Sequence, residues 1–116
     1  MKQIQPKLLA MHPFTTRRGR ALRQRVLERD LFTCQMCGVI LGTGRQSFRA
    51  AVVDHIRPIS LSPGLAWDES NLQAVCRDCH AICIGIEKRL APDAEAIEQA
   101  KREACKGPVN VYDTWA

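Results

Sequence analysis

The chain has 116 residues, of which 46% are hydrophobic and 25% are charged, as expected for one small globular domain. No apolar run is long enough to span a membrane and no leader-like segment follows Met1, so we expect a cytoplasmic protein without a membrane partner. The formal net charge of +5 favours a polyanionic partner. Aromatic residues make up only 5% of the chain, which predicts a thin core that needs a further staple.

The first 30 residues divide into an arm and a basic segment. Residues 1–16 contain two prolines and little periodicity, and we expect an N-terminal arm. Residues 17–30 are predicted to form a helix, because Leu22 and Val26 are four residues apart, as in a helix that contacts a core. The arginines of this helix are Arg17, Arg18, Arg20, Arg23, Arg25 and Arg29. Guanidinium groups suit phosphate oxygens, so these residues are candidate phosphate contacts; a solvated helix face is the alternative.

Two Cys-x-x-Cys pairs, Cys34/Cys37 and Cys76/Cys79, bracket the middle of the chain. Four thiolates bind Zn²⁺ as a tetrahedron, and each pair supplies two ligands from one turn of backbone. In a reducing compartment, paired cysteines are more often metal ligands than disulfides. Gly38 follows the first pair and permits the tight turn that such a site needs. We therefore predict a structural zinc site; two independent buried or redox-active pairs are the alternative.

Between the pairs, the sequence predicts two short strands around a loop. Residues 51–56 are rich in β-branched side chains and are predicted to form a strand that Pro58 ends. Residues 60–70 form a loop of a length that is often functional. Residues 72–75 are predicted to be the second strand, which gives a hairpin-like pair.

Two helices and a tail are expected after the second cysteine pair. The first helix starts at residue 77, with an apolar stripe of Cys79, Ile82, Cys83, Ile86 and Leu90. Pro92 is expected in the first turn of a second helix that ends near residue 105. Residues 107–116 are predicted to be a C-terminal tail.

Four polar residues have the chemistry of phosphodiester hydrolysis, which needs an oriented water, a base and a cation. Asp54 and His55 lie where the first strand should end, and Asn71 precedes the second. His80 is rotated by about 100° from its neighbour Cys79 on the helix, which leaves it free for a different ion. We predict that Asp54 and His80 hold a divalent ion and that His55 is the general base, because its reference pKa of about 6.5 suits proton abstraction near neutrality. Asn71 is predicted to tie the loop to the strand and to help orient His55.

Each of these residues has a structural alternative when it is considered alone. Asp54 and His55 are then polar residues at a strand end, and Asn71 is a turn residue. His80 is then a neighbour of the zinc site or a replacement ligand for it. The joint spacing of these residues and the cysteine pairs favours the functional interpretation.

The motifs resemble those of the zinc-containing HNH endonucleases of bacteria and their phages, over about residues 20–90. The matching motifs are Cys34-x-x-Cys37, Val53-Asp54-His55-Ile56-x-Pro58 and Trp67-Asp68-x-x-Asn71-Leu72-Gln73-Ala74-Val75-Cys76-x-x-Cys79-His80. The resemblance implies an α+β fold with a ββα-metal (His-Me finger) core, a zinc clamp and flanking helices, within a nuclease domain at residues 17–106. It carries the three motif letters onto His55, Asn71 and His80, with Asp54 as the metal-binding acid.

The same resemblance implies cleavage of DNA with Mg²⁺, Mn²⁺ or a similar ion. One departure concerns the helix after the second cysteine pair: relatives commonly carry a cluster of Lys or Arg after Cys-His, whereas this chain has residues 81–86 without charge. Two other hypotheses remain open. The first is a catalytically silent zinc module that binds nucleic acid. The second is an interaction module that binds a protein partner in a phage packaging or restriction assembly.

Overall fold

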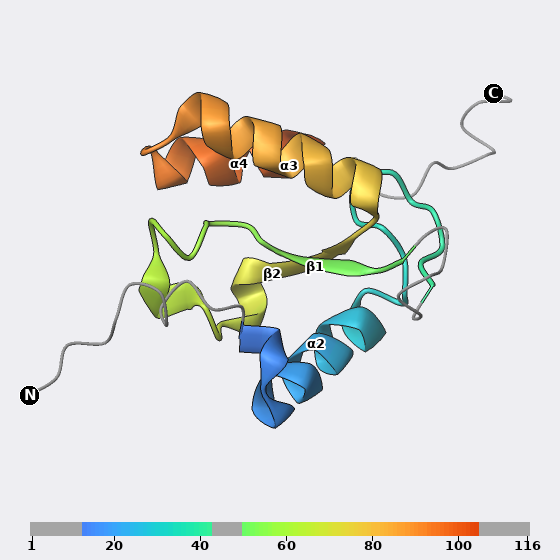
Figure 1. The fold of residues 1–116 in the computed structure, drawn as a ribbon. Coiled ribbons are helices and arrows are strands. Elements are labelled where there is room, and N and C mark those ends of the chain that lie inside the picture. Colours follow the sequence, from blue (N-terminus) through green and yellow to red (C-terminus); the bar gives the residue numbers. More distant parts are fainter. Residues whose placement is uncertain (1–12, 43–49, 105–116) are drawn as a thin grey trace, which may run out of the picture.

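The computed structural model describes residues 13–42 and 50–104, so most of the expected arm and the whole expected tail lie outside the described residues. The described chain has an α+β fold, as predicted (Figure 1). Its elements are η1 (Pro13–Thr15), α2 (Arg17–Arg29), β1 (Val52–His55), η2 (Pro63–Leu65), η3 (Glu69–Asn71), β2 (Leu72–Val75), α3 (Arg77–Leu90) and α4 (Ala94–Ala104). Among the described helices, none has the length and apolar character that crossing a membrane requires.

Strands β1 and β2 form a two-stranded antiparallel sheet between two helical layers. Figure 1 shows α2 on one face of the sheet and α3 with α4 on the other. Val53 is paired with Ala74, and Asp54 with Gln73. Because successive side chains of a strand point to opposite faces, these two pairs face different layers. The sheet therefore presents an apolar pair on one side and a polar pair on the other.

Helix α2 is fixed at both ends by local interactions. The Thr16 side chain accepts a 3.0 Å hydrogen bond from the Gly19 backbone N–H, which is an N-cap. Leu22 and Val26 are buried, as predicted from their spacing. After Arg29 the backbone passes through two residues with positive φ, Leu31 and Phe32. This left-handed stretch ends the helix and turns the chain toward the first cysteine pair.

Residues 33–41 form a turn that carries the first cysteine pair. Thr33 and Ile40 bridge its two arms, and Gly38 has φ of 82°, a conformation that favours glycine, in agreement with the turn predicted there. The backbone N–H of Gln35 donates a 2.9 Å hydrogen bond to the carbonyl of Ala74 in β2. The turn is therefore attached to the edge of the sheet.

Helix α3 packs its predicted face on the sheet, with one exception. Cys79, Cys83 and Ile86 are buried, whereas Ile82 is 52% exposed. The prediction for Ile82 was wrong, because it lies about 60° around the helix from Cys79, at the border of the packed face.

Helix α4 begins later than predicted. It starts at Ala94, and the side chain of Asp93 accepts a 3.0 Å hydrogen bond from the backbone N–H of Ala96. Because Asp93 is the capping residue, Pro92 precedes the helix and is not in its first turn.

One hydrophobic core joins α2, the turn, the sheet and α3. Its buried members are Leu22, Val26, Leu27, Cys34, Met36, Leu41, Ala51, Val53, Leu72, Ala74, Val75, Cys76, Cys79 and Cys83. Three of the four paired cysteines belong to this core, so the predicted zinc ligands lie inside the packed body of the domain.

Candidate active site

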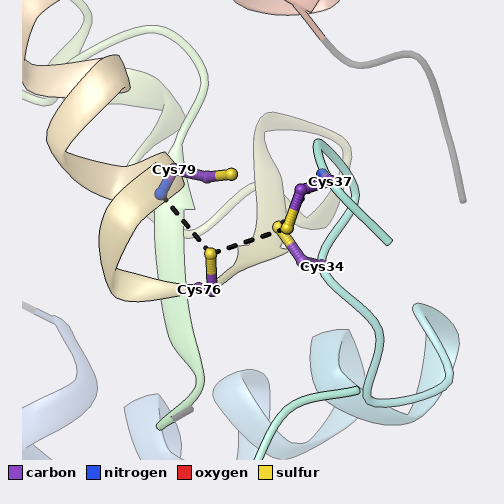
Figure 2. Close-up of side chains that lie close together, drawn as sticks. All are labelled: Cys34, Cys37, Cys76 and Cys79. Carbon is purple, nitrogen blue, oxygen red and sulfur yellow. Dashed lines mark hydrogen bonds between the residues drawn. The ribbon is translucent and has the colours of Figure 1, made fainter. Parts of the chain in front are cut away.

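The four paired cysteines gather into one cluster where the turn meets the start of α3 (Figure 2). Their sulfur atoms all lie within 4.8 Å of one another, and Cys37 Sγ is 3.7 Å from Cys76 Sγ. Zinc–sulfur bonds of about 2.3 Å in a tetrahedron place neighbouring sulfurs about 3.8 Å apart. The cluster has the donor set and the spacing to hold a metal such as zinc.

Backbone geometry supports thiolates in this cluster. The N–H of Cys37 lies 3.5 Å from Cys34 Sγ, and the N–H of Cys79 lies 3.4 Å from Cys76 Sγ. Burial raises the pKa of Cys34, but hydrogen bonds from the backbone of Cys37, Cys76 and Met36 outweigh this effect and lower it to about 7. Burial raises the pKa values of Cys37 and Cys79. A cation in the cluster would offset this cost of ionising buried thiols.

Asp54 and His80 come together on the polar side of the sheet. Asp54 is 3% exposed near the end of β1, and its Oδ1 lies 4.0 Å from Nε2 of His80, which is on the first turn of α3. The capping of α3 by Cys76 sets the position of His80. Both residues line a cavity of about 240 Å³, together with His55 and Glu87. The structure thus brings three of the predicted site residues to one cavity.

His55 is the last residue of β1, so its ring leaves the strand toward the long loop. Its Nε2 lies 3.0 Å from the carbonyl oxygen of Ala66, and its ring stacks on Phe14 at a centroid distance of 5.8 Å. A carbonyl oxygen only accepts hydrogen bonds, so Nε2 carries the proton and the lone pair of the neutral ring is on Nδ1. Burial lowers the pKa of His55, which favours the neutral ring near pH 7.

Asn71 closes the base of the loop that holds His55. Its Oδ1 accepts a 2.9 Å hydrogen bond from the backbone N–H of Arg57, and its Nδ2 donates to the carbonyl oxygens of Arg57 at 3.1 Å and Leu65 at 3.4 Å. Leu65 immediately precedes Ala66, whose carbonyl oxygen is paired with His55. Asn71 is buried, does not line the 240 Å³ cavity and contacts backbone groups on both sides of the loop.

Residues 34–82 match the family model of the HNH endonucleases. The matched segment makes up less than half of the chain, and it is similar to an HNH domain. The match begins at the first cysteine of the cluster and ends two residues after His80, so it includes all the predicted metal and catalytic residues. The searches of curated proteins and of solved structures found no match. The match indicates a nuclease or a nucleic-acid-interacting function.

The six arginines of α2, which precedes the matched segment, divide into two groups. Arg29 donates hydrogen bonds to Asp30 and to the carbonyl oxygens of Glu69 and Leu72, and the hydrogen bond to Asp30 raises its pKa. Arg25 pairs with Glu69 at 2.7 Å.

Arg23 also contacts the fold, through a 2.9 Å hydrogen bond to the carbonyl oxygen of Ala51. At the other end of α2, Arg17, Arg18 and Arg20 are exposed. Arg20 donates to the nearby carbonyl oxygen of Thr15, and the guanidinium of Arg18 lies 4.8 Å from the centre of the Trp67 ring.

Three residues of the site were not identified from the sequence. Gln73 Nε2 donates a 3.0 Å hydrogen bond to Asp54 Oδ2, and Lys101 Nζ lies within 3.2 Å of both Asp54 oxygens. Glu87 accepts a 2.8 Å hydrogen bond from the same ammonium. The sequence held one signal: Lys101 follows the buried Ile97 by four residues, on the apolar side of α4. A lysine at such a position indicates a buried charge with a partner.

Proposed function

We propose that the HNH domain is a metal-dependent endonuclease that hydrolyses phosphodiester bonds of DNA. The observation that carries the proposal is the convergence of Asp54, His55 and His80 on one cavity within a segment that matches the HNH endonuclease model. The alternative is a zinc-binding module that binds nucleic acid without cutting it.

Asp54 and His80 fit a divalent ion by donor chemistry and by distance. Carboxylate oxygen and imidazole nitrogen are ordinary ligands of divalent metals. Two ligands that each lie about 2.1 Å from one ion are at most about 4.2 Å apart, and the separation of Oδ1 and Nε2 is 4.0 Å. When bound, Mg²⁺ or Mn²⁺ would stabilise the negative charge that develops on the phosphate and on the leaving oxygen.

His55 supplies the base in this proposal. The Ala66 carbonyl oxygen holds the proton of the ring on Nε2, which makes Nδ1 the atom that accepts a proton from the attacking water. Stacking on Phe14 and burial keep the ring in one orientation. Asn71 acts through the loop, because it ties the backbone at Arg57 to the segment that presents the Ala66 carbonyl. His55 therefore performs the chemistry, and Asn71 positions it.

The N-terminal end of α2 supports DNA as the substrate. Phe14, just before this helix, touches His55, and Arg18 stacks on Trp67, the neighbour of Ala66. The exposed arginines at this end therefore lie next to the candidate catalytic base. Contacts from Arg17, Arg18 and Arg20 to phosphates would position the DNA without selecting its sequence. We assign the phosphate contacts mainly to these three arginines, because Arg23, Arg25 and Arg29 are engaged within the fold.

The test is cleavage of supercoiled plasmid by the zinc-loaded protein with Mg²⁺, Mn²⁺, Ni²⁺ or no added ion. We expect nicked or linear product with at least one added ion, and at least about a hundredfold slower cleavage by His55→Ala, since a general base typically contributes 10²–10⁴-fold. His55→Ala purified in the same way also controls for contaminating nucleases. Its zinc content and circular dichroism should equal those of the wild type.

Two results would contradict the proposal. In the first, the wild-type protein shifts DNA in a gel-shift assay but leaves the plasmid supercoiled with every ion. This result identifies the non-catalytic module instead. Equal cleavage by the wild type and His55→Ala removes His55 from the chemistry.

A further inference from the structure

Lys101 is a fully buried lysine in contact with the candidate catalytic carboxylate. Its side chain is 0% exposed, and its Nζ lies 3.2 Å from Asp54 Oδ1, 3.1 Å from Asp54 Oδ2, 2.8 Å from the His55 carbonyl oxygen and 2.8 Å from Glu87 Oε2. Lys101 is on α4 and Glu87 is on the second half of α3, so both lie outside the residues that match the HNH model. The segment after the HNH domain thus supplies a cation to its site.

Burial of the Lys101 ammonium costs free energy unless the groups around it stabilise the charge. Removing an ammonium from water costs several kcal/mol, which close carboxylates and good hydrogen-bond geometry offset. Here one positive charge faces two negative charges, those of Asp54 and Glu87. The same positive charge opposes any other cation that binds to Asp54, because like charges repel strongly in a poorly solvated site.

The two oxygens of Asp54 share Lys101 but differ in their other neighbours. Lys101 Nζ lies 3.2 Å from Oδ1 and 3.1 Å from Oδ2. Oδ2 also accepts a hydrogen bond from Gln73, whereas Oδ1 faces Nε2 of His80 at 4.0 Å. Gln73 is directly opposite Asp54 in the sheet, and Lys101 reaches the same carboxylate from α4. The Oδ1 side is thus the side on which a divalent ion would bind in the proposed function.

We propose that Lys101 is a built-in counter-ion of the candidate catalytic site, which holds Asp54 in place before a divalent ion binds and weakens the binding of that ion. Lys101 is accordingly a positioning residue. The inference rests on the proposed Asp54–His80 metal site. It deepens the proposed function by assigning to α4 the control of metal affinity.

The experiment is a Mn²⁺ titration of the zinc-loaded protein, in which electron paramagnetic resonance measures the free Mn²⁺. In Lys101→Met, Asp54 and Glu87 lose their shared cation, so we expect the Mn²⁺ dissociation constant to fall on the order of tenfold. Thermal unfolding of this variant should occur at a lower temperature than in the wild type without Mn²⁺, and Mn²⁺ should raise it by more than it raises that of the wild type. A lysine with a merely structural role would give the lower unfolding temperature without the tighter binding.

Matched variants separate the local charge from the net charge. Lys88→Met removes the same charge from an exposed position on α3 and should leave the dissociation constant within about twofold of the wild type. Glu87→Gln removes a carboxylate from the network and keeps Lys101, so it should weaken Mn²⁺ binding. If Lys101→Met does not fold without Mn²⁺, Glu87→Gln decides the question.

The outcomes distinguish this inference from the function on which it rests. Wild-type Mn²⁺ binding that Asp54→Asn leaves unchanged would refute the proposed metal site itself. If Asp54→Asn abolishes binding but a folded Lys101→Met binds no more tightly than the wild type, the counter-ion role of Lys101 is wrong and the metal site stands. Unchanged or tighter binding by Glu87→Gln also overturns the counter-ion role.

Discussion

Asn71 holds the loop that positions the candidate catalytic residue His55, and it does so through backbone groups. Its amide group satisfies the backbone N–H and C=O of Arg57 and reaches the carbonyl oxygen of Leu65. These bonds connect the start of the loop to the segment whose carbonyl oxygen is paired with His55. An amide is suited to this position because it donates and accepts at the same time.

We predict that Asn71→Ala will lower both stability and cleavage. Loss of the amide leaves buried backbone groups of Arg57 without partners, which costs about 1–3 kcal/mol per group. Urea unfolding should show this loss, and the plasmid cleavage rate should fall with little change in DNA affinity. Asn71→Asp is a second variant: it keeps the acceptor for the Arg57 N–H, but it places a carboxylate oxygen where the donor faced the carbonyl oxygens of Arg57 and Leu65, so it should also lower stability. A normal cleavage rate in Asn71→Ala would contradict the positioning role.

At the level of secondary structure, the two ends of α2 differ: one contacts the sheet and the other is exposed. Its C-terminal end binds the edge of β2: Arg29 donates to the Leu72 carbonyl oxygen at 2.6 Å, and Asp30 accepts from the backbone N–H of Ala74 at 2.9 Å. These side chains satisfy backbone groups at a sheet edge that another strand would otherwise pair with. Its N-terminal end carries exposed arginines beside the candidate site.

We predict that an arginine substitution at one end of α2 lowers stability, whereas one at the other end lowers DNA affinity. Arg29→Ala should destabilise the fold by about 1–3 kcal/mol, because it leaves the edge carbonyl oxygen of Leu72 without this donor and removes one of the donors to the Asp30 carboxylate. Arg17→Ala should leave the unfolding midpoint unchanged and weaken DNA binding, with a smaller dependence of affinity on salt. Denaturant unfolding and fluorescence-anisotropy titrations at several salt concentrations measure the two effects. Equal loss of stability in both variants would contradict this division of α2.

For the whole molecule, the cysteine cluster is the joint between the layers. It connects the turn after α2 to the start of α3, and it fixes the helix that presents His80. The buried members of the core described above include no aromatic side chain. Apparent binding free energies of structural zinc are about 10–16 kcal/mol, which is comparable with the total stability of about 5–15 kcal/mol of most domains.

We therefore predict that zinc removal unfolds the domain and does not merely inactivate it. Cys79→Ala should lose the bound zinc and its cooperative thermal transition, measured by metal analysis and circular dichroism. Cys83→Ala is the matched control: Cys83 is equally buried on the same helix but lies outside the cluster, so this variant should keep zinc and fold with a small loss of stability. A cooperative transition in zinc-free Cys79→Ala would show that the core suffices alone.

Much of the fold and part of the site could be predicted from the sequence. The strand at residues 72–75, helix α2 and the cysteine cluster agree with the predictions. Helix α2 is encoded by apolar residues four apart, and each half of the cluster is encoded by paired ligands on one turn. The start of α4 was missed by two residues, because either Pro92 or Asp93 can begin a helix.

Contacts between distant segments were decided only by the tertiary structure. Lys101 and Asp54 are 47 residues apart, and nothing local to either predicts their pairing. The same holds for Arg29, which resembles its neighbours in the sequence but reaches β2 because α2 packs on the sheet. The sequence by itself determined which residues can bind metal and where the elements form, since these depend on side-chain chemistry and local spacing. The packing of the layers decides which charges are paired inside the protein and which remain exposed for a substrate. Only the tertiary structure fixes that packing.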